Sequence, residues 1–282
     1  MFLSKICRLF CCKNNFKTVF FHDSGYLTLQ DRQMSRSEEK EKQGGGPKIR
    51  KVCSWNIQEL FWYHSLPKLT SILYHINCLD AEVLCLQEVF EPATIRSIIH
   101  NKTIRDKYPY FLSGDMKNKY IIGENSGLFV LSQYPIRFVD FKHLPNAICP
   151  DNFATKGVLY FCVGNLSFAL THLQSGSQSI ARQQLQFVMD QTPFKKNFIV
   201  LGDFNLNDAD VFLDVERNNT VITHNSQRII DYILPIECSF HINNTVLQID
   251  LDNVSDHYPI IGTIIYNVER GNKIVRHKKV LN

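Results

Sequence analysis

The sequence predicts a layered α/β sandwich, in which many short strands alternate with a few covering helices. Three observations support this fold class: the strand-like runs are short and apolar, some segments repeat apolar residues with a helical period, and the strands follow one another in both hairpin and crossover order. The chain has 282 residues, of which 44% are hydrophobic and 21% charged. This ordinary globular composition excludes a disordered or fibrous protein.

Apolar runs bounded by polar residues predict the strands in chain order. They lie at residues 51–55, 82–87, 126–132, 157–163, 166–172, 197–203, 228–234 and 255–265. Gly164-Asn165 separates two of these runs and is typical of a two-residue β-hairpin. Apolar residues at helical spacing predict an amphipathic helix over residues 68–77 and another after residues 177–179, and residues 93–105 form a further helical segment.

The net charge of +4 belongs to the ends of the chain. Residues 1–47 hold eight Lys or Arg and five Asp or Glu, residues 268–282 hold five and one, and the 220 residues between them carry a net charge of −3. A charged, glycine-rich stretch over residues 35–48 is typical of a linker. We therefore predict a basic leader and flexible linker over residues 1–47, a folded domain over residues 48–267 and a basic tail over residues 268–282.

The leader contains three cysteines that bear on localisation. Cys7, Cys11 and Cys12 stand among apolar and basic residues, where S-acylation together with positive charge would give stable membrane attachment. An unmodified terminus is the alternative, and the sequence leaves both open. The nine cysteines are odd in number and contain no CxxC pair, so we expect a reducing, intracellular, cytoplasmic location with peripheral membrane association. Five N-x-S/T sequons are the counter-evidence.

Polar side chains gather where the strands begin or end, and this is the chemically informative pattern. They are carboxylates, carboxamides and imidazoles, namely Glu88, Asp203, Asp256, Asn56, Asn205, His172 and His257. Taken singly, a Glu or a His after a strand is more often structural, as a cap or a solvated side chain, and a Gly-Asp-x-Asn block alone is also typical of a turn. Together they form a set that holds a hard divalent cation through oxygen ligands and leaves an imidazole for proton transfer. The oxygen-rich set favours Mg²⁺ or Mn²⁺ over zinc.

Seven sequence blocks carry a family resemblance. KVCSWNIQEL, VLCLQEVF, SGLFVLSQYPI, THLQS, VLGDFNLN, RIIDYIL and SDHYPI occur in this order within residues 49–266. In this order they resemble the endonuclease/exonuclease/phosphatase superfamily, whose fold is DNase I-like. The resemblance implies a four-layer α/β sandwich of two packed mixed sheets flanked by helices, and metal-dependent hydrolysis of phosphodiesters. A further block, CPDNFATKGVLYF, is more similar to neutral Mg²⁺-dependent sphingomyelinases, because Asp151 and Lys156 stand five positions apart before a strand that begins with Gly157.

The resemblance also implies where the metal and the phosphate lie. Glu88 is expected to bind Mg²⁺ (or Mn²⁺) directly, with Asp256 near the metal. Asn56 is expected beside Glu88, where it orients the phosphate or the metal-bound water.

For the remaining residues the resemblance implies roles in catalysis. His257 is the expected general base, as a neutral imidazole near pH 7, and Asp231 is expected to orient it. Asp203 and Asn205 would position the water and the scissile phosphate. His172 and Lys156, the latter in the block with Asp151, would stabilise the charged transition state.

Three functions remain open at the level of sequence. The first is a phospholipase C-type phosphodiesterase, expected to be a monomer at a membrane surface, that cleaves sphingomyelin or a related phospholipid. The second is a nuclease or other phosphatase, although a domain with net charge −3 is poorly suited to bind the negatively charged backbone of a nucleic acid. The third is a non-catalytic binding module. Two departures bear on lipid specificity: only 27 residues separate Asp203 from Asp231, and no aromatic-rich hairpin lies between Leu234 and Ser255.

Overall fold

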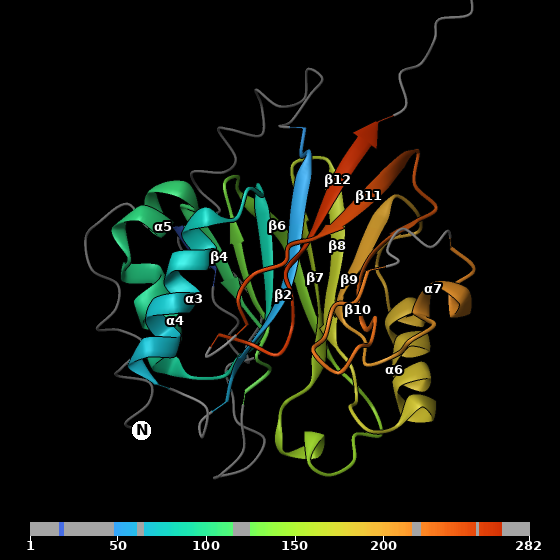
Figure 1. Ribbon diagram of the computed structural model, residues 1–282. Coiled ribbons are helices and arrows are strands. Elements are labelled where there is room, and N and C mark those ends of the chain that lie inside the picture. Colours follow the sequence, from blue (N-terminus) through green and yellow to red (C-terminus); the bar gives the residue numbers. More distant parts are fainter. Residues whose placement is uncertain are drawn as a thin grey trace, which may run out of the picture.

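Two β-sheets pack face to face in this computed structural model, and helices cover the outer face of each sheet (Figure 1). The structure describes residues 17–19, 48–60, 65–114, 125–215, 221–251 and 254–266. Both sheets contain parallel and antiparallel neighbours. The predicted four-layer α/β sandwich with two mixed sheets is confirmed.

One sheet has seven strands. In spatial order these are β1 (Lys17–Val19), β4 (Tyr110–Ser113), β5 (Phe129–Ser132), β3 (Val83–Val89), β2 (Lys51–Glu59), β12 (Ile260–Tyr266) and β11 (Phe240–Val246). The central pair β2 and β3 runs parallel, because the chain crosses over through a helix between them. Their carboxyl ends therefore lie at the same edge of the sheet.

The other sheet has five strands. In spatial order these are β10 (Asp231–Ile236), β9 (Phe198–Asp203), β8 (Leu166–His172), β7 (Gly157–Val163) and β6 (Ile136–His143). The predicted hairpin between β7 and β8 is confirmed, and Gly164 in its turn has a φ of 58°. Strands β8 and β9 are parallel and β10 is antiparallel to β9, so β8 and β9 end where β10 begins.

The helices divide between the two outer faces (Figure 1). The seven-stranded sheet is covered by α3 (Leu66–Cys78), α4 (Pro92–His100) and α5 (Lys102–Lys107), and the five-stranded sheet by α6 (Gln178–Asp190) and α7 (Ala209–Phe212). The single helical segment expected over residues 93–105 is two helices. Asn101 follows α4 and caps α5, because its side chain accepts a hydrogen bond from the Ile104 N–H at 3.1 Å.

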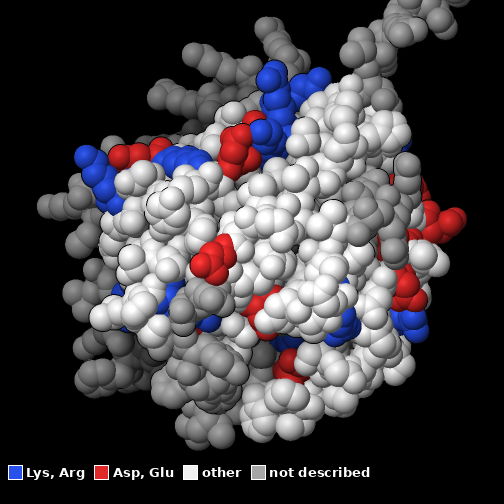
Figure 2. Space-filling model, in the orientation of Figure 1, with Lys and Arg blue, Asp and Glu red and all other residues white. Residues whose placement is uncertain are grey.

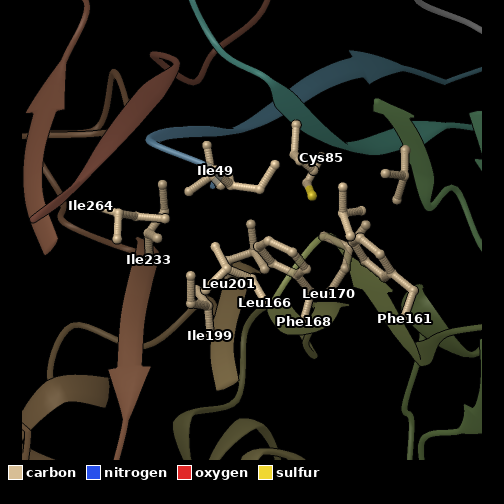
Figure 3. Close-up of a cluster of buried hydrophobic side chains, with 14 of the residues drawn as sticks. Ile49, Cys85, Phe161, Leu166, Phe168, Leu170, Ile199, Leu201, Ile233 and Ile264 are labelled. Carbon is tan, nitrogen blue, oxygen red and sulfur yellow. The ribbon is translucent and has the colours of Figure 1, made fainter. Parts of the chain in front are cut away.

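The central core fills the space between the two sheets (Figure 3). Phe161 and Phe168 stack there with ring centroids 5.0 Å apart, and Leu201 and Ile233 are fully buried beside them. Burying such side chains contributes about 1.5–3 kcal/mol each. This rigid core fixes how the ends of the two sheets meet.

Several strands carry too little signal to be predicted from the sequence. Strand β6 lies at a sheet edge and is mostly half-buried, so its residues lack a clear alternation. Strands β4 and β11 are also not among the strands predicted from the sequence. Strand β1 belongs to the segment predicted as leader and linker, and pairs in parallel with β4.

The remaining leader residues, 1–16 and 20–47, lie outside the described residues, as does the chain from residue 267 onward. The acylation expected at Cys7, Cys11 and Cys12 therefore falls outside them too. In the part of the chain that the structure describes, none of the helices has the length and apolar character that crossing a membrane requires.

Candidate active site

Strand register brings three of the predicted site residues side by side in the five-stranded sheet. Asp203, the last residue of β9, pairs with His172 at the end of β8 and with Asp231 at the start of β10. In the other sheet Asn56 of β2 pairs with Gln87 of β3, which directly precedes Glu88. The polar residues at the strand ends thus lie on two facing sheet edges.

Asn56 joins the two edges. Its side-chain Nδ2 donates to Glu88 Oε1 at 3.0 Å and to Asp203 Oδ2 at 3.1 Å, and the residue is fully buried. The Gln58 N–H donates to Asn56 Oδ1 at 3.0 Å across a bulge in β2, where Gln58 has a φ of 51°. This bond fixes the orientation of the amide, so that its N–H groups face the carboxylates.

Glu88 has the properties of a cation ligand. Its backbone has a φ of 57°, a costly conformation for a side-chain-bearing residue that is often found at functional sites. Its Oε2 atom is buried without a hydrogen-bond partner among the described residues. Burial raises the pKa of Glu88 to about 7, despite the hydrogen bond from Asn56. A divalent cation would relieve the cost of this buried, partly satisfied carboxylate.

His257 is held by Asp231. The His257 Nδ1 lies 2.9 Å from Asp231 Oδ2, and both residues are buried. The free Nε2 lies 3.6 Å from Asp203 Oδ2 and 3.7 Å from Asp256 Oδ1. Burial alone would lower the pKa of His257, but the carboxylates of Asp231 and Asp203 outweigh it and raise the pKa to about 10. The neutral imidazole expected near pH 7 therefore needs added positive charge beside these carboxylates.

The loop before β12 anchors the backbone of His257. The Trp55 Nε1–H donates to the His257 carbonyl at 3.0 Å. Ser255 Oγ donates to the Asn56 carbonyl at 2.7 Å and accepts from the His257 N–H at 3.0 Å. These three bonds tie the imidazole-bearing loop to β2, the strand that carries Asn56.

His172 differs from His257 in its protonation. Its Nε2 lies 3.5 Å from Asp203 Oδ2 and 3.8 Å from Glu88 Oε1. The pKa of His172 is lowered to about 3, mainly by burial. The positive charge of Lys156 also lowers it, and this effect is larger than the opposite effect of the Asp203 carboxylate. His172 is therefore uncharged at neutral pH, and would act on a phosphate as a hydrogen-bond donor.

Lys156 and Asp151 reach the same strand ends. Lys156 is buried, and its Nζ lies 3.3 Å from Asp151 Oδ1 and donates to the Leu173 carbonyl at 2.8 Å. Asn205 Nδ2 donates to that carbonyl at 3.2 Å, and the Asn205 N–H donates to Asp203 Oδ1 at 2.9 Å. The structure thus brings the Asp–Lys pair into one polar network with Asp203 and Asn205.

Gly202 allows the end of β9 to lie close to the backbone of β8. Its φ is 133°, and a Cβ atom at this position would lie 1.9 Å from the Thr171 carbonyl oxygen of the neighbouring strand. Only glycine fits this close approach. The glycine in the GDFN block therefore sets the position of Asp203, which follows it.

Two further residues at the site are absent from the sequence-based expectation. His224 Nε2 lies 3.3 Å from Asp256 Oδ2, and its ring packs against that of His257 with centroids 4.5 Å apart. Lys68 on α3 is buried, and its Nζ donates to the Gln58 carbonyl. Neither residue follows a recognisable strand or stands in one of the seven blocks, so the sequence carries no signal for either.

Three groups of side chains, among the residues that the structure describes, place potential metal-ligand atoms within 4.8 Å of one another. They are Glu88, His172 and Asp203; Asp203, Asp231 and His257; and His224, Asp256 and His257. The first group includes the carboxylate with the unpartnered Oε2. Its carboxylate oxygens suit a hard cation such as Mg²⁺.

A cavity of about 660 Å³ adjoins the third of these groups, because Asp256 is one of its lining residues. Its lining residues come from the end of β2, the start of α3 and the loops before β10 and β12: Gln58, Ser65, Lys68, Asn225, Ile249, Asp250, Leu251, Val254, Ser255, Asp256 and Tyr258. Asp256 belongs both to this cavity and to the potential metal ligands. The volume is within the range of small-ligand pockets.

Comparisons with known proteins give a matching family model and several solved structures of the same fold. A family model described as "Endonuclease/Exonuclease/phosphatase family" matches residues 53–257. No curated protein sequence matches the chain.

Several solved structures share the fold. Sphingomyelinase C from Streptomyces griseocarneus aligns with a TM-score of 0.63 and 18% identity over 78% of this chain and 100% of that one. A beta toxin mutant from Staphylococcus aureus with bound magnesium ions aligns with a TM-score of 0.62 and 17% identity, over 77% and 99%. TDP2 from C. elegans aligns with a TM-score of 0.54 and 18% identity, over 82% and 80%. At these identities the likeness shows the fold alone.

Proposed function

The chain belongs to the endonuclease/exonuclease/phosphatase family of metal-dependent phosphoesterases, and we propose that it is a Mg²⁺-dependent phosphodiesterase that removes the headgroup of a phospholipid, with sphingomyelin as the first candidate substrate. The observation that carries the hydrolytic part is the closed set of contacts among Asn56, Glu88, Asp203, His257 and Asp231. These contacts bring together the residues that we propose as the cation ligand, the base and its orienting carboxylate.

The proposed reaction is phospholipase C-type hydrolysis. A water oxygen attacks phosphorus while its proton passes to His257 Nε2, and the bond from phosphorus to the oxygen of the lipid alcohol breaks. Asp231 holds the imidazole and stabilises it once it is protonated. The departing alkoxide takes up a proton from solvent and leaves as the alcohol, and the headgroup leaves as its phosphomonoester. His257 then returns its proton to solvent.

The other residues bind and orient the phosphate. Mg²⁺ held by Glu88 would neutralise phosphoryl charge and, by its own charge, lower the pKa of nearby His257 toward neutrality. Asn56 would donate to a phosphoryl oxygen or to the attacking water. His172 would donate as a neutral ring, and Lys156 would supply the positive charge that His172 lacks at neutral pH.

Three features support a lipid rather than a nucleic acid as the substrate. The Asp151–Lys156 pair, which resembles sphingomyelinases in sequence, contacts the network of Asp203 and Asn205. The cavity beside the site has one cationic residue, Lys68, and two carboxylates, Asp250 and Asp256, among its described lining residues, so it suits a neutral or cationic substituent. On the described part of the face in Figure 2, Lys and Arg form small groups beside Asp and Glu. Nucleic-acid binding draws most of its affinity from contacts between phosphates and clustered Lys or Arg side chains.

The deciding experiment compares two substrates on one protein preparation. Purified protein with Mg²⁺ is assayed for phosphocholine release from sphingomyelin vesicles and for nicking of supercoiled plasmid. We expect phosphocholine release that EDTA abolishes, and no nicking. Nicking without phosphocholine release would favour the nuclease alternative, and activity on neither substrate would leave another phosphoester as the substrate and contradict the lipid proposal.

Lys156→Ala tests the lipid assignment within the same assay. Removing the buried cation should suppress phosphocholine release. The matched control is Lys142→Ala, because Lys142 is 43% exposed on β6 and pairs only with neighbouring Asp140 among the contacts described. Nicking that survives Lys156→Ala, in a protein that releases no phosphocholine, would refute the sphingomyelinase assignment.

A further inference from the structure

Residues 221–230, here called the strap, lie against the loop that carries the general base. The Tyr258 N–H donates to the Thr223 carbonyl at 2.8 Å, and the Asn225 N–H donates to the Asp256 carbonyl at 2.9 Å. These two backbone bonds fall on either side of His257 in the sequence. The strap therefore holds the backbone of the residues that flank the imidazole.

The strap also holds Asp231, the partner of His257. The Thr223 side chain is fully buried, and its Oγ1 accepts hydrogen bonds from the N–H groups of Ile230 at 3.1 Å and Asp231 at 3.2 Å. Thr223 therefore contacts the start of β10 through its hydroxyl and the His257 loop through its carbonyl. Its neighbour His224 faces the site.

The hydrogen bonds of His224 define which ring nitrogen carries the proton. Its Nδ1 accepts from the Ser226 N–H at 3.0 Å, so this nitrogen is unprotonated. A neutral His224 ring must then carry its proton on Nε2, which lies 3.3 Å from Asp256 Oδ2. The ring also packs edge-on against the ring of His257, at an interplanar angle of 76°. His224 thus contacts both the side chain of Asp256 and the imidazole of His257.

We propose that His224 is a positioning residue for the reaction, which directs Asp256 and His257 into the site. Its Nε2–H holds Asp256 Oδ2, and this leaves Oδ1 turned toward His257 Nε2 at 3.7 Å. Its ring packs against the ring of His257 and limits the movement of that ring. Without these contacts the Asp256 carboxylate is held less firmly, and a small displacement of a reacting group lowers the rate. This proposal rests on the proposed phosphodiesterase activity, but not on the identity of the lipid.

The test uses two polar variants that differ in reach. In His224→Gln the side-chain amide extends to about the place of Nε2, so a donor to Asp256 is kept. In His224→Asn the amide reaches only to about the place of Nδ1, and that donor is lost. His241→Asn on the exposed side of β11 is the control, because it makes the same change away from the site.

Steady-state kinetics on bis(p-nitrophenyl) phosphate at saturating Mg²⁺ give the first readout. We expect His224→Asn to lower kcat about 10–100-fold, with little change in KM, and His224→Gln to recover most of the loss. Thermal unfolding should be similar for both variants and for the control. Equal kcat for His224→Asn and the unaltered protein, or a Gln variant as slow as the Asn variant, would overturn the proposal.

A spectroscopic readout on the unaltered protein tests the proton position on His224 directly, and the variant serves only to assign the signals. Two-bond ¹⁵N–¹H correlation spectra of ¹⁵N-histidine-labelled protein should show one imidazole with unprotonated Nδ1 and protonated Nε2, whose signals are lost in His224→Asn. A protonated Nδ1 at His224 would contradict the arrangement. If the protein cleaves bis(p-nitrophenyl) phosphate but releases no phosphocholine from sphingomyelin, the lipid assignment fails while this test still decides the role of His224.

Discussion

At the scale of single residues, opposite effects on two histidines define the site. Both rings are buried within 4 Å of Asp203. His257 faces Asp231 as well, and its pKa is raised to about 10, whereas burial and Lys156 lower the pKa of His172 to about 3. The ring of His257 therefore holds its second proton tightly, whereas the ring of His172 is neutral at neutral pH. The partners of each ring, and not its residue type, decide its chemistry.

Glu88→Gln tests the cation ligand. We expect loss of turnover, because the variant removes the charge of the carboxylate while keeping its shape and its place beside Asn56. The measurements are activity across a Mg²⁺ titration and the rise in melting temperature on adding Mg²⁺, which reports binding without turnover. Near-normal activity at saturating Mg²⁺ would show that Glu88 is not the essential ligand.

The raised pKa of Glu88 predicts how cation binding depends on pH. Below its pKa of about 7 the carboxyl group is protonated and binds a cation poorly, and above it the carboxylate is free to bind. At fixed Mg²⁺ the stabilisation should therefore increase between about pH 5.5 and about pH 8. Differential scanning fluorimetry measures it, and Glu88→Gln should remove this dependence. Stabilisation that stays constant across this range would argue against Glu88 as the titrating ligand.

Removing His257 and its partner should have unequal effects. His257→Ala should lower kcat about 10²–10⁴-fold, the usual contribution of a general base. Asp231→Asn should cost less, because the imidazole remains but loses its orienting carboxylate and part of its raised pKa. Both are measured on bis(p-nitrophenyl) phosphate. Equal losses would mean that Asp231 acts more directly than by orienting His257.

At the scale of elements, the site depends on where parallel strands end. Two pairs of neighbouring strands are parallel, β2 with β3 and β8 with β9, so the carboxyl ends of each pair lie at one edge of its sheet. The two edges are joined by the hydrogen bond between Asn56 and Asp203. Single-residue features set each ending: the bulge at Gln58, the positive φ of Glu88 and the close approach at Gly202. The strands thus bring the two sheet edges close together, and these local backbone features orient the side chains toward the site.

Gly202→Ala tests the ending of β9. The added Cβ meets the Thr171 carbonyl oxygen at 1.9 Å, so the strand must shift and Asp203 must move with it. Overpacking of this kind costs about 1–3 kcal/mol beyond the cost of an unfavourable φ. The control is Gly176→Ala, because Gly176 has a φ of 69° with nothing within 4 Å and should show only the backbone cost of about 1–2 kcal/mol. Urea unfolding measures both, and equal losses would show that the close approach is relieved without strain.

At the scale of the whole molecule, charge is separated between the folded domain and the chain ends. The 220 residues between the predicted leader and tail carry −3, and the ends carry the positive charge. A lipid hydrolase must dwell at a membrane surface, where each Lys or Arg near an anionic leaflet contributes about 1 kcal/mol. The leader and its cysteines are therefore the proposed means of attachment.

Deleting residues 1–47 should separate catalysis from attachment. Of the described elements the deletion removes only β1, a three-residue edge strand, so six strands of its sheet and the whole site remain. We expect nearly unchanged hydrolysis of detergent-dispersed substrate and a shift of the protein from membrane to soluble fractions of cells.

Replacing Cys7, Cys11 and Cys12 together by Ser isolates the acyl contribution. Unchanged membrane recovery of this triple variant would exclude acylation as the cause of attachment. Unchanged recovery after the full deletion would exclude the leader itself.

Local patterns in the sequence predict the fold class and nearly all the polar residues of the site, because buried strands and the polar residues at their ends are visible as such patterns. Glu88, Asp203 and His257 were predictable for this reason. The contacts that cross between the sheets, such as Asn56 with Asp203 and His257 with Asp231, are known only from the tertiary structure. It also decided the protonation of the two histidines and the place of His224. A pKa and a contact depend on which distant groups burial brings within a few ångströms, and no local pattern in the chain records that.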